Sequence, residues 1–300
     1  MTTIPPAGRA MLFALLMLAP TTVVVPQTTE SWTPGPYLTQ AIARVYSWVT
    51  ANTITARGVG FDDGISILGT LVRPGASSTV VRHLTAGTTY YFVAGGDNDA
   101  QDVDLAVKDM NGRTLASDVL ADAEPVVEFT PRQSGKYQVV LSLPRSSGDA
   151  FLVVAILRAG GWTMPVDRMV LATAKLVRAG SHLAERRAAG FLHERNQWAV
   201  WGGVVAADDS FELTSVTMGS GARVVVAASD SHDGDIDLFV SRSAGPIVEK
   251  DDAQDADAVV TLETSSGRMY DVKSRNAGRA PHFVMTGVLQ VGSGGARVEP

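Results

Sequence analysis

Two clusters of aspartates, one in each half of the chain, are the residues whose type and spacing could do chemistry. Hard divalent cations such as calcium prefer several carboxylate and carbonyl oxygens around one point. Alternate residues of a β-strand project from one face, so a strand and its adjoining turn can supply such a set. The sequence therefore predicts calcium as the candidate cofactor, with these metal ligands: Asp97, Asp99, Asp102, Asp104, Asp230, Asp233, Asp235 and Asp237.

The same aspartates have a structural interpretation, because Asp and Asn cap turns and keep sheet edges soluble. The pattern also differs from a helix–loop–helix calcium loop. Counting from Asp233, the sixth and twelfth positions are Leu238 and Ala244, where that loop requires Gly and Glu. Calcium binding and turn capping both remain open from the sequence.

The histidines and glycine-rich turns match no catalytic motif. His193-Glu194 lacks the second histidine of a zinc-protease helix, since Gln197 stands at that position. The chain contains neither a Gly-x-Ser-x-Gly elbow nor a Gly-x-x-x-x-Gly-Lys phosphate loop. We therefore expect a protein that is not an enzyme. A secreted hydrolase that uses converging aspartates is the alternative.

The composition is that of a globular protein, with 45% hydrophobic and 19% charged residues. A net charge of -6 and a pI near 5.4 argue against a protein that coats nucleic acid or an anionic membrane. The sequence has no cysteine, which excludes a disulfide scaffold and thiolate chemistry.

The N-terminus has the pattern of a secretory signal. A short segment carrying Arg9 precedes the apolar run AMLFALLMLAP at 10–20, which is shorter than the roughly 20 residues that span a membrane. We expect a signal peptide and leader, a secreted or periplasmic (cell-envelope) location, and no membrane span apart from the signal segment. A retained anchor is the alternative.

The two halves of the chain align with each other under a single offset, the one that carries Asp102 onto Asp235. It places 102–105 on 235–238. It also pairs three further identical residues: Gly69 with Gly202, Asp97 with Asp230, and Tyr137 with Tyr270. Two copies are too few for a solenoid, so a tandem repeat of one domain is indicated.

Each copy has the pattern of short strands preceded by a helix. In 102–108, Val103, Leu105 and Val107 alternate with polar or small residues, as in a half-buried strand. Before the second copy, a mostly apolar stripe recurs at helical spacing: Met169, Val170, Thr173, Leu176, Val177, Gly180, Leu183 and Ala184. A shorter stripe before the first copy is made by Ile42, Val45, Tyr46 and Val49.

These patterns predict a mainly β protein with added helices, built of two tandem antiparallel β-sandwich (jelly-roll-like) domains, each preceded by an amphipathic helix. The expected division is a signal peptide and leader (1–30), a helical segment (31–58), the first β-sandwich (59–160), a helical connector (161–195), the second β-sandwich (196–292) and a tail (293–300).

Both copies resemble the bacterial pre-peptidase C-terminal (PPC-like) family over about 69–157 and 202–289. The resemblance is carried by the Asp-x-Asp-Leu strand, the Asn111-Gly112 turn and the final strand at 134–139, SGKYQV. The second copy departs from it, with Ala-Gly-Pro at 244–246 in place of Asn-Gly. The resemblance implies a non-catalytic jelly-roll module of exported proteins, some of which bind calcium or matrix polymers. It carries the calcium role onto Asp102, Asp104, Asp235, Asp237 and the adjacent turn aspartates.

The function expected from the sequence is that of an exported, non-catalytic, tandem β-sandwich binding or accessory protein, with calcium as the candidate stabilising ion. Its partner would be an extracellular protein or polysaccharide of the medium or envelope, and not nucleic acid. A ligand-free structural spacer is a further alternative. Four tryptophans near the unit boundaries could form a carbohydrate or peptide platform, or could pack in the core: Trp32, Trp162, Trp198 and Trp201.

Overall fold

One helix and nine strands follow each other in the same order in each half of the chain, within the residues that the computed structural model describes: 35–53, 58–185, 189–194 and 197–292. All of these residues belong to one compact unit, Ser31–Pro300. The predicted signal peptide and leader at 1–30, Trp32 and the predicted tail at 293–300 lie outside the described residues.

The first half consists of α1 (Pro36–Thr53), β1 (Val59–Phe61), β2 (Ile67–Val72), β3 (Ser77–Leu84), β4 (Tyr90–Gly96), β5 (Ala100–Lys108), β6 (Thr114–Asp118), β7 (Val126–Phe129), β8 (Gly135–Ser146) and β9 (Ala150–Ala159). The second half consists of α2 (Asp167–Ala184), β10 (Ala189–Phe191), β11 (Val200–Val205), β12 (Ser210–Thr217), β13 (Gly221–Ser229), β14 (Ile236–Arg242), β15 (Ile247–Asp251), β16 (Asp257–Thr264), β17 (Met269–Asn276) and β18 (His282–Val291). The predicted fold class is confirmed: mainly antiparallel β, with a helix ahead of each set of strands.

The strands form three antiparallel sheets. A ten-stranded sheet has the order β16-β13-β18-β11-β2-β9-β4-β7, with β1 added on β9 and β10 added on β18. Two four-stranded sheets, β3-β8-β5-β6 and β12-β17-β14-β15, each belong to one half. The inward-facing aliphatic and aromatic side chains of all three sheets belong to a single buried core.

The two halves join edge to edge through β2 and β11. The antiparallel register pairs Val200 with Gly69, Trp201 with Leu68, and Gly202 with Ile67. The offset that aligns the two copies carries Leu68 onto Trp201, so this central pair lies on a local twofold axis between the halves. Both side chains are fully buried. The large sheet is therefore continuous across the repeat.

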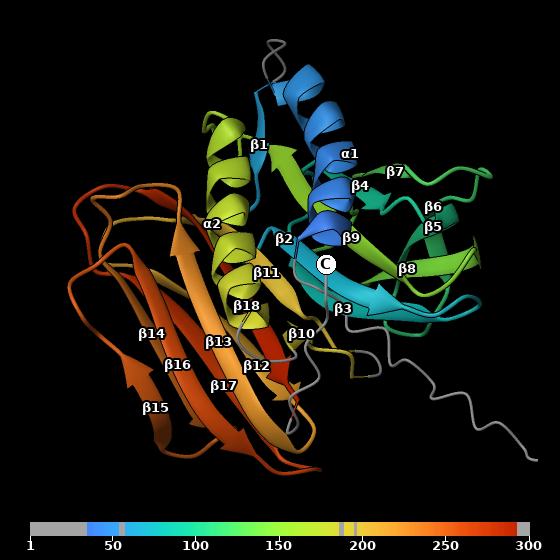
Figure 1. The fold of residues 1–300 in the computed structure, drawn as a ribbon. Helices are drawn as coiled ribbons and strands as arrows, with labels where there is room; N and C mark the ends of the chain where they lie inside the picture. Colours follow the sequence, from blue (N-terminus) through green and yellow to red (C-terminus); the bar gives the residue numbers. More distant parts are fainter. Residues whose placement is uncertain (1–34, 54–57, 186–188, 195–196, 293–300) are drawn as a thin grey trace, which may run out of the picture. The chain divides into compact units, whose positions relative to one another are not determined.

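The two helices lie on one face of the large sheet (Figure 1), where α1 contacts β4 and β9 while α2 contacts β13 and β18. Their buried positions correspond under a slightly shorter offset, which carries Leu38 onto Met169. The buried residues are, in order, Leu38, Ala41, Ile42, Val45 and Val49 on α1, and Met169, Ala172, Thr173, Leu176 and Gly180 on α2. The predicted stripe was wrong at Val170, which is 38% exposed.

Close helix–sheet contact depends on glycines in the strands beneath. A Cβ at Gly95 would lie 2.9 Å from the Ala41 carbonyl oxygen on α1. A Cβ at Gly287 would lie 3.0 Å from Leu176 Cδ1 on α2. The buried Thr173 hydroxyl donates to the Met169 carbonyl at 2.8 Å, so the polar residue in the stripe is satisfied within its own helix. In the part of the chain described, no helix is long and apolar enough to cross a membrane.

Candidate functional site

In each half, one aspartate on the edge strand of the small sheet accepts a hydrogen bond from the edge strand of the large sheet. The two aspartates, Asp118 and Asp251, are equivalent under the repeat offset. The Asp118 carboxylate accepts hydrogen bonds from Leu120 N at 3.2 Å and Val126 N at 2.9 Å. Asp251 accepts from Ala253 N at 3.3 Å and Val259 N at 2.8 Å, at the positions that the repeat offset assigns to the same three residues. Backbone donors at the start of a turn and on an edge strand are thus satisfied by one side chain.

A second equivalent pair caps the next turn. The Asp122 carboxylate accepts from Glu124 N at 2.9 Å, and its carbonyl accepts from Val103 N. Asp255 accepts in the same way from Asp257 N, and its carbonyl accepts from Ile236 N. The turn-capping interpretation of the acidic residues therefore describes Asp118, Asp122 and their counterparts.

Three of the four predicted metal ligands at the ends of β4 and β13, Asp97, Asp99 and Asp230, use their carboxylates in hydrogen bonds or ion pairs. Asp97 is fully buried and accepts from Phe151 N at 2.8 Å and Asp99 N at 3.0 Å, while burial raises the pKa of its carboxyl. The Asp99 carboxylate accepts the Ser147 hydroxyl at 2.8 Å. In the second half, Asp233 is exposed and Asp230 is buried in the ion pairs described below.

The other two predicted ligands of the first half, Asp102 and Asp104, lie on β5. Asp104 is close to the capping aspartate Asp118. Burial, together with the negative charges of Asp102 and Asp118, raises the pKa of Asp104. One carboxylate oxygen of Asp102, Oδ1, is buried and has no hydrogen-bond partner among the described residues.

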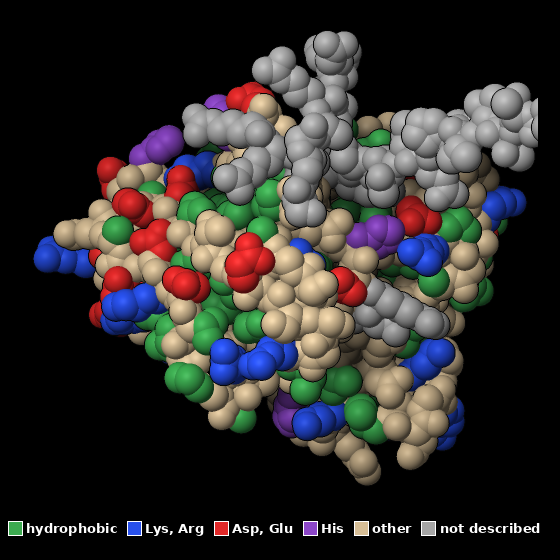
Figure 2. All heavy atoms as spheres, turned by 60° about the horizontal axis from the view of Figure 1, so that its bottom comes forward, with side chains coloured by type: hydrophobic (Ala, Val, Ile, Leu, Met, Phe, Trp, Pro, Cys, Tyr) green, Lys and Arg blue, Asp and Glu red, His purple; other side chains and the backbone are tan. Residues whose placement is uncertain are grey.

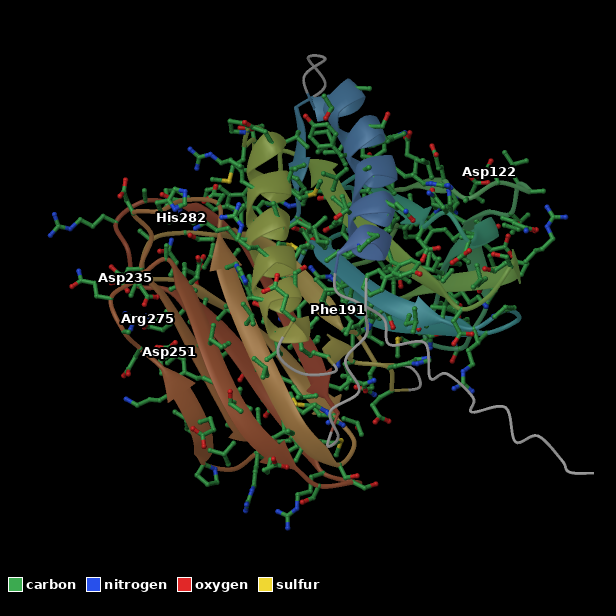
Figure 3. The ribbon with its side chains drawn as sticks, viewed as in Figure 1. Asp122, Phe191, Asp235, Asp251, Arg275 and His282 are labelled. Atoms are coloured by element: carbon green, nitrogen blue, oxygen red, sulfur yellow. The ribbon has the colours of Figure 1, made fainter. Side chains whose placement is uncertain are left out.

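The equivalent group of aspartates in the second half lies beside a positively charged side chain, Arg275. Burial raises the pKa of Asp237; Arg275 lowers it, and Asp235, Asp252 and Asp251 raise it further. Arg275 lies 3.4 Å from Asp237 Oδ2 and 3.4 Å from Asp208 Oδ1. In Figure 3 Asp235, Asp251 and Arg275 lie together at one edge of the second sandwich, whereas Asp122 lies in the first.

Among the described residues, no group of three or more His, Cys, Asp and Glu is arranged to hold a metal ion. Within each predicted cluster, the aspartates fall into two sets that have different neighbours. The aspartates after β4 and β13 bind local donors and cations, whereas those near the start of β5 and β14 lie beside the capping aspartates. Calcium binding stays a prediction for all eight aspartates, and in the second set the carboxylates repel one another.

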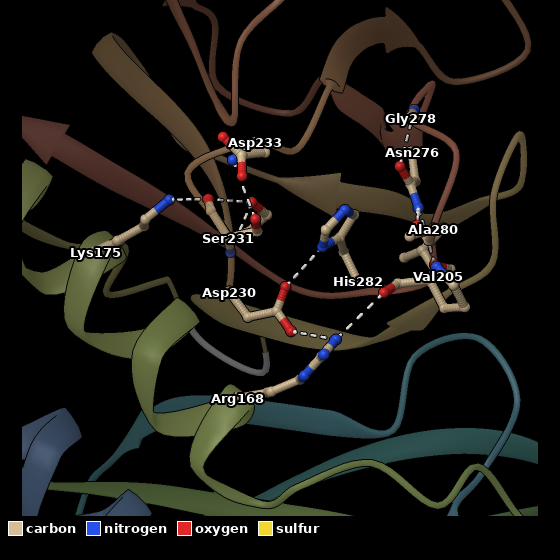
Figure 4. A network of polar contacts seen from close by, with 12 residues as sticks. Arg168, Lys175, Val205, Asp230, Ser231, Asp233, Asn276, Gly278, Ala280 and His282 are labelled. Atoms are coloured by element: carbon tan, nitrogen blue, oxygen red, sulfur yellow. Dashed lines mark hydrogen bonds and ion pairs between the residues drawn. The ribbon is translucent and has the colours of Figure 1, made fainter.

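A buried ion-pair network that sequence reasoning missed lies between α2 and the second sandwich (Figure 4). Asp230 Oδ1 lies 2.9 Å from His282 Nδ1, and Asp230 Oδ2 lies 3.3 Å from Arg168 Nη1. The side chain of Asp230 is 2% exposed. The network joins α2, the turn after β13 and β18, which are far apart in sequence. One feature of the sequence indicated this network: Asp230 directly follows an apolar strand.

The described part of the first half does not repeat this network. Asp97 takes the place of Asp230, because the backbone N–H of each donates to the carbonyl of a matching phenylalanine, Phe151 or Phe283. The residue before that phenylalanine is Ala150 in the first half and His282 in the second. A different ion pair does repeat between each helix and equivalent positions at the edge of the large sheet. Arg44 of α1 lies 3.9 Å from Glu124, just before β7, and Lys175 of α2 lies 3.1 Å from Asp257, the first residue of β16.

A groove of about 660 Å³ lies where the two halves meet. Its walls are the end of β2, the β2–β3 turn and the start of β3 from the first half, and His193 and Glu194 after β10 from the second. Asp149 Oδ2 lies 3.4 Å from His193 Nε2 and 3.8 Å from Arg73 Nε. Burial lowers the pKa of His193, which disfavours the charged imidazolium in the groove.

The groove and its surroundings present charges of both signs. Arg73 and Glu194 line it together with the hydroxyl side chains Ser77, Ser78 and Thr79. On the face in Figure 2, acidic and basic side chains are interspersed and hydrophobic ones are scattered between them. Neutral or zwitterionic polar surfaces suit such a groove better than a polyanion does.

No protein-family model matches the sequence, and no curated protein matches it, so the PPC-like resemblance rests on the residues quoted for it alone. Solved structures resemble the fold weakly. The oxalate decarboxylase of Lactobacillus farciminis is 12% identical over 78% of this chain and 84% of its own, with a TM-score of 0.20. The exported protein XepA of PBSX is 11% identical over 75% and 86%, with a TM-score of 0.23. A cupin 2 conserved barrel domain protein of Leptotrichia buccalis is 11% identical over 78% and 91%, with a TM-score of 0.18.

The class of protein follows from the chain's own topology, which is that of a mainly antiparallel β protein with two small sheets and one large sheet shared by the two halves. The identities and TM-scores carry no argument about activity, so the function is argued from the chain's own residues.

Proposed function

We propose that the chain is an exported, non-catalytic accessory protein whose paired β-sandwiches hold an extracellular or envelope partner, a protein or a polysaccharide. The observation that carries the proposal is the groove of about 660 Å³ to which both halves contribute. A continuous sheet joins its two walls, so the groove is held in one shape before a partner arrives. The PPC-like sequence resemblance supports export and the absence of catalysis.

The placement of the acidic residues favours binding over hydrolysis. Burial raises the pKa of three carboxyls, those of Asp97, Asp104 and Asp237. A hydrolase would place such a carboxyl in a cleft. None of the three lines the groove, and the carboxylates that do lie near it, Asp149 and Glu194, are accompanied by Arg73 and His193.

Site-specific photocrosslinking in the native host tests this proposal. A photoreactive amino acid at Ser77, which is exposed in the groove, should give a discrete product in the medium or envelope fraction. The same group at Glu249, exposed on β15 of the second sandwich, is the matched control. Adding Arg73→Glu should weaken the Ser77 product. Equal labelling from both positions, or protein confined to the cytoplasm, would contradict the proposal.

Calcium is the second element of the proposal, supported by the mutual repulsion of Asp235, Asp237 and Asp251. A cation bound only by the folded state raises the midpoint of thermal unfolding. We expect calcium to raise that midpoint relative to chelator, and the Asp235→Ala, Asp237→Ala double variant to abolish the rise. An unchanged midpoint would remove calcium and leave these residues as turn and edge features.

A further inference from the structure

A second cavity, of about 490 Å³, lies beside α1 and is separate from the groove. Its walls are the C-terminal half of α1, including Tyr46 and Thr50, and the segment 162–167 that leads into α2. The aromatic rings of Tyr46 and Trp162 and the thioether of Met164 are only partly buried. The volume falls within the range of about 300–1,000 Å³ that small-ligand pockets occupy.

Hydrogen bonds from both its backbone and its side chain fix Trp162 beside this cavity. Its backbone forms an isolated antiparallel bridge with Phe61, with N–H···O distances of 2.8 and 3.0 Å. Its indole Nε1 donates to Asp63 Oδ1 at 3.0 Å. Arg158 holds the other oxygen of that carboxylate at 2.8 Å. An aromatic ring that is already positioned loses little conformational freedom when a ligand stacks on it.

The polar groups around the ring are hydroxyls and one carboxylate. Tyr46, Thr50, Thr163 and Asp167 line the cavity, and the described residues of its lining include no Lys, Arg or His. The Oγ1 atom of Thr50 is buried and has no hydrogen-bond partner within the described part of the chain. This set repels anions and suits a ligand with an apolar face and several hydroxyls, because hydroxyl groups both donate and accept hydrogen bonds.

The α1 wall of this cavity is not matched in residue type by α2. Under the helix offset that carries Leu38 onto Met169, Tyr46 and Thr50 correspond to Val177 and Ser181 on α2. The second half thus lacks the tyrosine ring at the matching position. The described lining residues come from α1, from the segment before α2 and from the first residue of α2, and none lies in a β-strand, so an extended peptide would find no strand edge among them to pair with.

We propose that this cavity binds one ring of a neutral polysaccharide, with the sugar's apolar face against Trp162 and its hydroxyls on Thr50 and Asp167. This site is independent of the proposed groove and names a ligand class for the first half of the chain. Alternating apolar C–H faces and equatorial hydroxyls are the features of a pyranose that match an indole ring beside hydroxyl and carboxylate groups.

Isothermal titration of the purified protein tests the proposal with three neutral oligosaccharides, cellohexaose, xylohexaose and chitohexaose, and with oligogalacturonate as the anionic comparison. At least one neutral probe should bind, and oligogalacturonate should bind more weakly. Trp162→Ala should weaken binding by about tenfold or more, the loss typical of a buried aromatic anchor. Trp162→Phe should retain most of the affinity.

Two further variants keep the result interpretable. Thr50→Val preserves shape and removes the unpaired hydroxyl, so it should weaken binding even if Trp162→Ala unfolds. Arg73→Glu alters only the groove and should leave oligosaccharide binding unchanged, which separates failure here from failure of the proposed function. The proposal is overturned if no neutral probe binds at millimolar concentration, if oligogalacturonate binds as tightly, or if folded Trp162→Ala and Thr50→Val bind like the native protein.

Discussion

Replacing Asp230 with alanine tests whether the buried network holds α2 on the second sandwich. The carboxylate lies 2.9 Å from His282 Nδ1 and 3.3 Å from Arg168 Nη1. The substitution removes both contacts at once. The backbone hydrogen bond from Asp230 N to the Phe283 carbonyl, at 2.9 Å, does not involve the side chain and should persist.

The two lost contacts differ in size because their partners differ in exposure. The His282 side chain is 10% exposed, and a hydrogen bond to a charged group contributes about 1.5–3 kcal/mol. The Arg168 side chain is 40% exposed, so solvent screens its ion pair to about 1 kcal/mol or less. Together the two losses should lower the free energy of unfolding by about 1.5–4 kcal/mol.

Urea denaturation followed by circular dichroism measures this difference, with and without calcium. The control is Asp233→Ala, which alters an exposed carboxylate in the same turn and should change stability by less than about 0.5 kcal/mol. The loss at Asp230 should be the same with chelator, because Arg168 and His282 supply the groups that face this carboxylate. A loss below about 1 kcal/mol, or one seen only with calcium, would refute the reasoning.

Four other substitutions probe the β2–β11 join, the two capping aspartates and the raised pKa of Asp104. Trp201→Ala should lower the free energy of unfolding by about 3–5 kcal/mol in urea denaturation, because its fully buried side chain fills the joint between the halves. Asp118→Ala and Asp251→Ala should each cost about 1–2 kcal/mol by the same measurement, and clearly unequal costs would contradict their equivalence. The raised pKa of Asp104 means that the folded state keeps this proton to higher pH than the unfolded state, so this carboxyl's contribution to stability falls as the pH rises from 3.8 to the raised value. Asp104→Asn removes that contribution, so unfolding midpoints of the variant should gain on those of the native protein as the pH rises through this range. An unchanged pH dependence would contradict the reasoning.

Local patterns in the sequence predicted the repeat and most elements correctly. Alternation in 102–108 predicted β5, since Val103, Leu105 and Val107 are all fully buried. Helical spacing predicted α2, except that Val170 faces solvent. These features depend on residues a few positions apart, whose side-chain directions follow from the period of the strand or helix.

The sequence left undecided whether the tryptophans bind a ligand or pack in the core. Trp198 is 7% exposed and Trp201 is fully buried, so both pack in the core. Trp162 is partly buried and lines a cavity. A tryptophan's sequence neighbours do not distinguish these cases, because burial is decided by the sheet that packs against it.

The sequence by itself determined the copy number and the strand and helix periods, and it offered turn capping as one of two interpretations of the aspartates. Only the tertiary structure decided which basic side chain lies beside each carboxylate. Asp237 pairs with Arg275 on the neighbouring strand β17, and Asp230 contacts Arg168 on α2 and His282 on β18. The tertiary structure also joined the halves through β2 and β11. Period and capping are set by local backbone geometry, whereas these contacts depend on strand order and register between segments far apart in the chain.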